Sequence, residues 1–171
     1  MTSAKSLSAS LEDYLEAIFH IVCRKQASRA KDIADRMGVS KSSVTGALRS
    51  LSERGLVNYA PYDIITLTDE GRRIAERVVH RHEVLKGFFV EVLGVDENDA
   101  EQNACRMEHR VSSTILRRLA CLDEFIGTGS PCDRQQWLKQ FRDFCGHREQ
   151  ILADQQTRDN GESPPPGHKR T

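Results

Sequence analysis

Three residues in the middle of the chain combine side chains that bind transition metals. Cys105, Glu108 and His109 stand at positions i, i+3 and i+4, so a helix would place a thiol, a carboxylate and an imidazole on one face. All three groups are ligands for first-row divalent ions. Glu101 lies one turn before Cys105 and adds a further candidate ligand to the same face. The spacing therefore predicts part of a metal site.

Two other segments offer matching groups. Asp13 and Glu16 lie beside the apolar positions of a predicted helix over 8–24, and His82 lies within a predicted helix over 68–93. Taken singly, the two acids are typical of a solvated helix face, and His82 is typical of a hydrogen-bonded core histidine. Because three helices each present groups of the required type, we expect them to converge around one or two ions.

A helix-turn-helix begins the set of elements that would position these residues. Ser28 precedes a short helix that ends at Gly38, and Ser40 is placed to cap a second helix. A turn of about three or four residues that contains glycine is typical of the DNA-binding helix-turn-helix. Two β-prone runs follow, over 56–59 and 64–67, and indicate a hairpin. Together these elements predict a winged helix.

Helices dominate the rest of the sequence. After the long helix, apolar spacing predicts helices over 97–109 and 113–125 and an amphipathic helix through 137–144. The fold class is therefore mainly α, with an N-terminal winged helix-turn-helix followed by an all-helical domain. The expected boundaries are a DNA-binding domain over 1–70, the helical domain over 71–153 and a disordered tail over 154–171.

Charge is unevenly distributed, although 25 basic residues balance 25 acidic ones. Between residues 23 and 62, eight basic residues stand against three acidic ones, a net charge of +5. Between residues 91 and 108, six acidic residues stand against one basic residue, a net charge of −5. The basic segment favours a polyanionic partner and the acidic segment favours a cation, although either patch alone could be solvated surface.

Residues of the predicted helix-turn-helix and wing are candidates for contacts with double-stranded DNA. Phosphate contacts are expected from Arg29, Lys31, Lys41, Arg49 and the wing near Tyr62. Base contacts are expected from Ser42, Ser43 and Thr45, near the start of the second helix. Serines at this position could instead serve as helix caps, a role that is compatible with phosphate contact.

Several classes of protein are excluded by composition. No apolar run approaches the roughly 18 residues that a membrane span needs. The N-terminus lacks the pattern of a secretory signal, so a cytoplasmic location is expected. The five cysteines are odd in number and form no CxxC motif, which favours reduced thiols over a disulfide framework.

Four collinear segments are Ser10–Ile18, Val39–Thr45, Arg81–Glu83 and Ala104–His109. Together they resemble the diphtheria-toxin-repressor and manganese-transport-regulator family of metal-dependent regulators. The resemblance runs in register from about residue 8 to residue 126. The SH3-like domain of the longer, iron-responsive members looks absent.

The resemblance implies a homodimeric repressor that binds a palindromic operator when a divalent metal is bound. The metal ligands that it implies are Asp13, Glu16, His82, Cys105, Glu108 and His109. Asp13 matches the manganese-responsive type and Cys105 matches the iron-responsive type, so the set is a hybrid. Because a thiolate prefers softer ions, Fe²⁺ is the first expectation and Mn²⁺ the second, with Co²⁺ or Zn²⁺ able to bind in vitro. Lys86 replaces an acidic ligand of a second site in the iron-responsive type.

Two other functions use the same residues. A winged-helix thiol sensor could use oxidation of Cys105 without any metal, and a small metallohydrolase could use the predicted ligand set. The sequence offers no separate base, nucleophile or glycine-rich loop beside the ligands. A non-enzymatic regulator of metal-homeostasis genes is therefore the leading interpretation.

Overall fold

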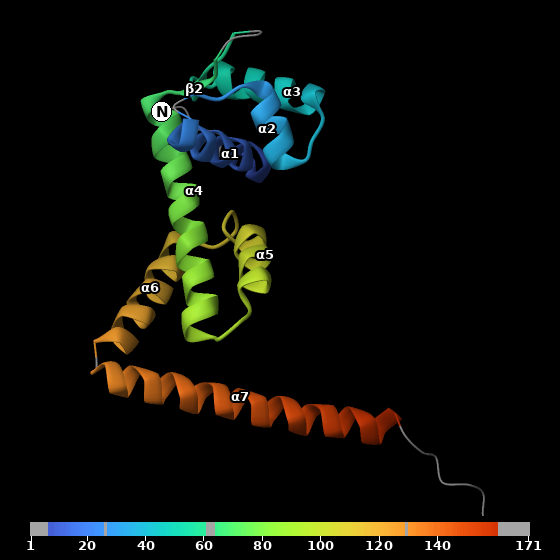
Figure 1. Cartoon of the computed structure of the whole chain (residues 1–171), viewed down its shortest axis with the longest axis vertical. Helices are drawn as coiled ribbons and strands as arrows, with labels where there is room; N and C mark the ends of the chain where they lie inside the picture. The colour runs from blue at the N-terminus through green and yellow to red at the C-terminus, as the bar shows by residue number, and fades with distance from the viewer. Residues whose placement is uncertain (1–6, 26, 61–63, 129, 161–171) are drawn as a thin grey trace, which may run out of the picture.

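The computed structural model describes residues 7–25, 27–60, 64–128 and 130–160, with side chains left out at 131, 132 and 153–160. Within these residues, no helix is long and apolar enough to cross a membrane. The molecule is elongated, with a winged helix at one end, a long central helix and a final helix crossing the opposite end (Figure 1).

The winged helix consists of three helices and a short hairpin. Helices α1 (Ala9–Lys25), α2 (Ala30–Met37) and α3 (Lys41–Glu53) pack together beside strands β1 (Val57–Asn58) and β2 (Thr66–Leu67). The strands are antiparallel, and Val57 pairs with Leu67. The winged helix expected from the sequence is confirmed, although both strands are shorter than the predicted β-prone runs.

Local sequence signals explain where these helices begin and end. Gly38 adopts a left-handed conformation with φ of 65° and ends α2. Ser40 Oγ accepts a hydrogen bond from the Ser43 amide at 3.2 Å and so caps α3, as predicted. Ser28 is buried, and its backbone pairs with that of Ile65 through two hydrogen bonds of 2.8 and 3.3 Å. Arg29, rather than Ser28, is the residue directly before α2.

A single hydrophobic core holds the winged helix together. It is formed by the inward faces of α1, α2 and α3 and by the hairpin, and its largest fully buried side chains are Leu15, Ile18, Ile33, Leu48, Leu51 and Ile65. The apolar spacing of the predicted helices corresponds to these inward faces. This packing fixes the position of α1, which carries the first candidate ligands.

The second domain is built around helix α4 (Asp69–Gly87), which continues as a π-helical turn, η1 (Phe88–Val92). Helices α5 (Glu97–Met107) and α6 (Ser113–Gly127) lie on either side of the lower half of α4 (Figure 1). A small core of Leu85, Ala104 and Leu116 joins the three helices. The long helix was predicted correctly, but its π-helical end was not.

The start of α4 lies directly against the hairpin. Thr68 Oγ1 accepts a hydrogen bond from the Gly71 amide at 3.1 Å and donates one to the Gly55 carbonyl at 2.8 Å. Gly71 is buried, and a Cβ atom there would overlap the carbonyl of Leu56. Glycine is therefore required for this close approach between the two domains.

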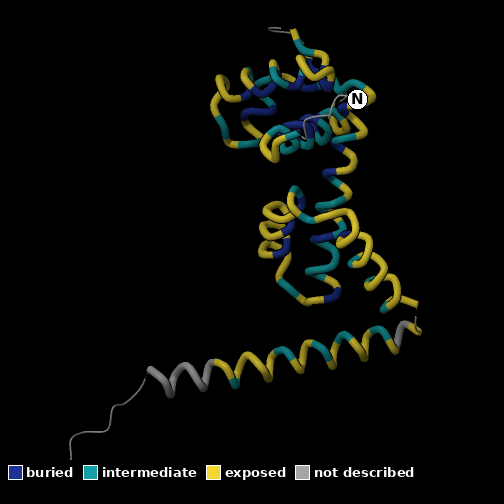
Figure 2. The backbone as a smooth tube through the Cα atoms, turned by 180° about the vertical axis from the view of Figure 1, so that it is seen from behind, coloured by how far each residue is buried: buried dark blue, intermediate teal, exposed yellow. Residues whose placement is uncertain are grey.

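Helix α7 (Pro131–Asn160) leaves the body of the molecule as a single helix (Figure 2). The disordered tail was expected to begin at residue 154, but the helix continues to Asn160. The first helix-breaking residue after α7 begins is Gly161, apart from Gly146 within the helix, so local sequence does not stop the helix earlier. The rest of the expected tail, 161–171, lies outside the described residues.

Candidate metal centre

The end of α5 meets α1 at a cluster of three candidate ligands. Each of Asp13, Glu108 and His109 offers one ligand atom, and these atoms lie within 4.8 Å of one another. His109 Nε2 lies 2.7 Å from Asp13 Oδ1 and 3.1 Å from Glu108 Oε1. Residues 96 positions apart in the sequence are thereby brought together.

Glu108 is the most informative member of this cluster. Its side chain is 1% exposed, and its Oε1 atom accepts no hydrogen bond within the described residues, although His109 Nε2 is nearby. A buried carboxylate oxygen without a hydrogen-bond donor is costly unless a cation neutralises it. An oxygen-rich cluster with an imidazole suits a divalent transition metal. The residues present therefore fit such an ion.

The local backbone explains how Glu108 and His109 reach this position. Helix α5 ends at Met107, and the Glu108 amide still donates to the Ala104 carbonyl at 2.9 Å. Glu108 keeps helical dihedral angles, with φ of −55° and ψ of −32°. The predicted i, i+3 relation to Cys105 therefore survives, although Glu108 and His109 lie just beyond the helix.

Glu12 contacts the cluster through His109, and the sequence analysis missed it. Its Oε2 atom lies 2.7 Å from His109 Nδ1 and 2.8 Å from Arg81 Nη2. This contact leaves His109 Nε2 directed towards Asp13 and Glu108. The spacing of Glu12 and Glu16, four residues apart on one helix, is the signal that could have indicated a shared face.

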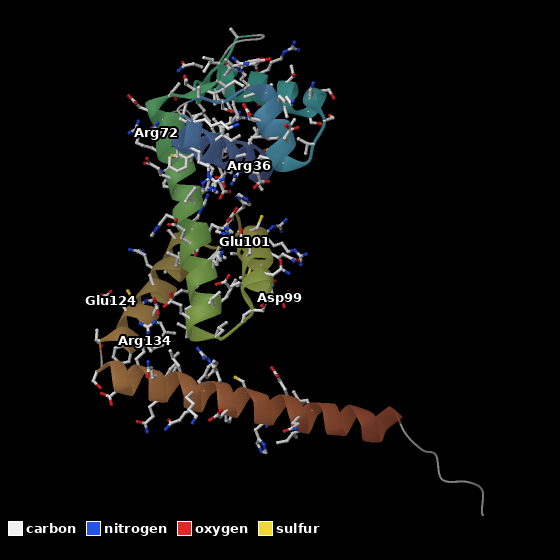
Figure 3. The ribbon with its side chains drawn as sticks, viewed as in Figure 1. Arg36, Arg72, Asp99, Glu101, Glu124 and Arg134 are labelled. Carbon is white, nitrogen blue, oxygen red and sulfur yellow. The ribbon has the colours of Figure 1, made fainter. Side chains whose placement is uncertain are left out.

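His82 extends the cluster towards α4. Its Nδ1 atom lies 2.8 Å from Glu108 Oε2, and its Nε2 atom lies 3.3 Å from Glu101 Oε2. The hydrogen bond to Glu108, opposed by burial and aided by Glu101, raises the pKa of His82 to about 9. Lys86 Nζ lies 2.8 Å from the same Glu101 oxygen, so its ammonium group points towards the acid. Figure 3 labels Glu101 on α5, next to α4.

Asp13 and Glu16 both bring carboxylates to the centre from α1. Burial raises the pKa of each carboxyl group, and the nearby Glu108 raises it further. Although burial disfavours its charged form, the Glu12 hydrogen bond and the charges of Asp13 and Glu108 raise the pKa of His109. Mutual repulsion among these acids is the electrostatic condition that a bound cation relieves.

Cys105 lies at the edge of the centre rather than inside it. The residue is exposed and does not belong to the three-residue cluster. Partial burial, followed by the charges of Glu108 and Asp13, raises the pKa of its thiol. Of the six predicted ligands, the structure therefore brings Asp13, Glu108 and His109 together most closely, with the other three around them.

The predicted DNA contacts lie on the winged helix. Arg29, Lys31, Lys41 and Arg49 are exposed. The hydroxyls of Ser42 and Ser43 lie 2.8 and 2.9 Å from Ser40 Oγ, and the Thr45 hydroxyl donates to the Lys41 carbonyl at 2.9 Å. Capping and local hydrogen bonds thus use the hydroxyls that were expected to contact bases. Tyr62 lies outside the described residues.

Comparison with known proteins matches both halves of the chain to one family. Residues 6–64 match the N-terminal DNA-binding domain of the iron-dependent repressors, and residues 68–138 match their metal-binding and dimerisation domain. An uncharacterised helix-turn-helix transcriptional regulator of Methanocaldococcus jannaschii is 39% identical over 114 residues, which cover 66% of this chain and 91% of that protein.

Solved structures show the same relationship. A manganese-dependent transcriptional repressor in complex with manganese is 35% identical, with a TM-score of 0.57, over 65% of this chain and 51% of that one. The protein ScaR with bound Zn²⁺ is 28% identical, with a TM-score of 0.58, over 67% of this chain and 54% of that one. The chain thus spans about half the length of these solved chains. It belongs to the iron-dependent repressor family of DNA-binding, metal-dependent transcriptional regulators.

Proposed function

We propose that the protein is a homodimeric repressor whose affinity for a palindromic operator rises when a divalent metal binds between α1 and the end of α5. The observation that carries this proposal is the convergence of Asp13, Glu108 and His109 around the buried Oε1 atom of Glu108, which accepts no hydrogen bond within the described residues. Glu16, His82 and Cys105 complete the proposed ligand set, and Glu101 is an additional candidate.

The location of the proposed ligands would couple metal binding to DNA binding. Asp13 lies on α1, whose apolar face packs in the winged-helix core, whereas Glu108 and His109 lie in the helical domain. A bound ion would neutralise the acids and favour one spacing of the two domains. Coupling of this kind is typically on the order of 1–3 kcal/mol. Two recognition helices must meet major grooves roughly 34 Å apart, so a small change between domains alters the fit to DNA.

Among divalent ions, we propose Fe²⁺ as the physiological activator and Mn²⁺ as the second choice. Carboxylates and imidazole accept either ion, and the Cys105 thiolate would favour the softer Fe²⁺. Co²⁺ and Zn²⁺ are expected to bind in vitro for the same reason. The oxygen-rich inner cluster keeps Mn²⁺ close to Fe²⁺ in this ranking.

We propose further that the winged helix contacts DNA through its exposed cations. Arg29, Lys31, Lys41, Arg49 and the wing near Tyr62 would neutralise phosphates, and Ser42, Ser43 and Thr45 would face the bases. Reading of bases by these hydroxyls requires that their present local hydrogen bonds be shared or exchanged. The regulator would act in the cytoplasm, where we expect it to meet its DNA operator.

The thiol-sensor alternative has less support than metal sensing. A redox-active cysteine needs a lowered pKa, because the thiolate is the reactive form. Partial burial of Cys105, followed by the carboxylates around it, instead raises the pKa of its thiol. The regulators of this family are DNA-binding proteins, and we propose that this chain likewise has a regulatory rather than an enzymatic function.

Metal stoichiometry and metal-dependent DNA retention test the proposal together. The wild-type protein and a Glu108→Ala, His109→Ala double variant are titrated anaerobically with Fe²⁺ and Mn²⁺. The wild type should bind metal tightly and retain operator DNA better when loaded. The double variant should lose both properties while its helix content, measured by circular dichroism, stays unchanged. Unchanged metal stoichiometry in the variant would show that the ligands are misassigned.

A further inference from the structure

Helix α7 extends for 30 residues and contacts the body in its first half (Figures 1 and 2). Arg134 Nη2 lies 3.0 Å from Glu91 Oε2 and 3.1 Å from Asp123 Oδ1, where α6 and α7 meet (Figure 3). Farther along, the Arg142 side chain lies close to Gly94. Single helices in water gain most of their stability from packing of an apolar face. We therefore expect the rest of α7 to pack its apolar face against another surface.

One face of α7 is apolar and open to solvent. At about 100° per residue, the apolar side chains fall on one side of the helix, and the polar residues Lys139, Asp143 and Gln150 fall on the other. This apolar stripe comprises Trp137, Leu138, Phe141, Phe144, Ile151 and Leu152. Phe144 is 63% exposed, Leu152 is 54% exposed and Trp137 is 44% exposed. Arg148 falls within the stripe, between Phe144 and Ile151. Exposed apolar side chains gathered on one helix face indicate an interaction surface.

The stripe begins inside the part of the chain that matches a dimerisation domain. That match covers 68–138 and so includes Trp137 and Leu138, whereas 139–152 continue the stripe beyond it. We propose that α7 pairs antiparallel with α7 of a second copy of this chain, through the apolar stripe. The dimer would thereby gain a contact that extends past the family's matched domain.

The stripe is self-complementary in the antiparallel arrangement. Its apolar residues are distributed nearly symmetrically about the midpoint between residues 144 and 145. Pairing about this midpoint puts Trp137 beside the partner subunit's Leu152. It also puts Phe141 beside the partner subunit's Arg148, where a guanidinium can stack on an aromatic ring. The stripe spans about 22 Å at 1.5 Å per residue, which is long enough for a specific helix pair.

Charge and overall shape both favour the antiparallel orientation over the parallel one. A parallel pair would place Arg148 beside its own copy, and like charges in contact are unfavourable. In Figure 1, α7 crosses the long axis of the molecule at the end opposite the winged helix. A two-fold axis parallel to the long axis of the molecule would turn both winged helices towards one DNA. The same axis makes two crossing α7 helices antiparallel.

A groove at the junction of α6 and α7 could bind the C-terminal part of the partner subunit's α7. The groove has a volume of about 320 Å³, and Leu122, Phe125 and Trp137 contribute apolar surface to it. Phe125 is 74% exposed, the largest exposure among the large apolar side chains described. Antiparallel pairing brings the partner subunit's Leu152 next to this groove, where it would cover Phe125.

Analytical ultracentrifugation of the full chain tests whether the apolar stripe of α7 contributes to dimerisation. A Phe144→Glu variant places a charge in the stripe, and the matched control Gln150→Glu places the same charge on the polar face. The dimer dissociation constant should rise at least tenfold for Phe144→Glu and stay unchanged for Gln150→Glu. Metal stoichiometry should be the same in both, which separates this proposal from the metal site. Equal dissociation constants for the two variants and the wild type would overturn the proposal.

Cross-linking tests the orientation independently. In a Trp137→Cys, Leu152→Cys double variant, mild oxidation should join residue 137 of one copy to residue 152 of the other, as read by peptide mass spectrometry. A Lys139→Cys, Gln150→Cys control on the polar face should give no link at those positions. Links of 137 to 137 and 152 to 152 would indicate a parallel pair. That result, or the absence of any link through 137 and 152, contradicts the proposal.

Discussion

The Nδ1 atom of His109 lies 2.7 Å from the Oε2 atom of Glu12, a residue 97 positions earlier in the chain. Arg81 contacts the same carboxylate oxygen at 2.8 Å and so holds it in place. With Nδ1 occupied in this way, the Nε2 atom of His109 faces Asp13 and Glu108. A carboxylate behind a ligating histidine fixes the tautomer and the orientation of the ring.

Replacing Glu12 should therefore weaken metal binding without removing a ligand. We expect Glu12→Gln to lower metal affinity by about 10- to 100-fold, the usual cost of losing such a supporting group. Glu70→Gln is the matched control, because Glu70 pairs with Arg73 on the surface of α4, away from the cluster. Isothermal titration with Mn²⁺ measures both variants. Equal affinity in Glu12→Gln and the control would mean that Glu12 does not support the ligand.

Metal affinity should depend on pH over an unusual range. The hydrogen bond to Glu108 raises the pKa of His82 to about 9, above its ordinary value of 6.5, so the imidazole is protonated at neutral pH. A metal binds the unprotonated ring, so the ion must displace this proton. Apparent affinity should rise as the pH increases from 7 towards 9, by up to about tenfold per pH unit for each proton displaced.

Anaerobic Mn²⁺ titrations at several pH values measure this dependence. His82→Gln removes the proton, so its affinity should be lower but should rise less steeply with pH than that of the wild type. A wild-type affinity that is constant between pH 7 and pH 9 would contradict the assignment of His82 as a ligand.

Cys105 should influence which ion the protein prefers. Replacing its sulfur with a carboxylate removes the softest group near the centre, so Cys105→Glu should shift the preference from Fe²⁺ towards Mn²⁺. Parallel anaerobic titrations of operator binding against free Fe²⁺ and free Mn²⁺ provide the comparison. The proposed ranking is wrong if the wild type responds to Mn²⁺ at far lower concentrations than to Fe²⁺.

The close approach at Gly71 predicts opposite effects for two glycine substitutions. Gly71→Ala should destabilise the fold by about 1–3 kcal/mol, because its Cβ would overlap the Leu56 carbonyl. Gly46→Ala on α3 meets no atom within 4 Å and should stabilise the helix by up to about 1 kcal/mol. Urea unfolding of the metal-free protein measures both. Similar midpoints for the two variants would show that the domain contact tolerates a side chain.

Exposed cations and hydroxyls of the winged helix should affect DNA binding in different ways. Arg49→Ala should weaken binding to every sequence and reduce the slope of log affinity against log salt by about 0.9 for a lost phosphate contact. Thr45→Ala should instead change the preference between operators. Fluorescence anisotropy at several salt concentrations separates the two. A sequence-selective loss in Arg49→Ala would place its side chain at the bases.

The winged helix was predictable because its signals are local. Ser40, Thr68 and Gly38 act at helix ends through their own side chains or backbone, so residue type alone indicates the boundary. The sequence also named Asp13, Glu108 and His109 as candidates: Glu108 and His109 are adjacent, each in helical register with Cys105, and Asp13 lies on another predicted helix. The structure brings the three side chains within 4.8 Å of one another. That they bind a metal stays a prediction.

The remaining features depend on contacts between distant segments. Glu12 contacts His109, 97 residues away, and Arg81, 69 residues away, and no local pattern indicates these pairings. Ser28 looks like a residue that starts a helix, but its pairing with Ile65 depends on where the hairpin folds. The π-helical turn at 88–92 lies in an apolar run with ordinary helical composition. Helix α7 continues past residue 154, which the sequence did not indicate because its helix-compatible polar residues resemble those of a disordered tail.

Operator binding at fixed salt, measured with and without metal, tests the central claim most directly. The full-length dimer is titrated onto a palindromic operator in the presence of a chelator and then of saturating Fe²⁺ or Mn²⁺, alongside the Glu108→Ala, His109→Ala double variant. We predict that metal tightens binding by the wild type about 5- to 150-fold, the range of typical coupling energies, and leaves the double variant at the affinity of the metal-free protein. Equal operator affinity of the wild type with and without metal would leave a DNA-binding protein and contradict its role as a metal sensor.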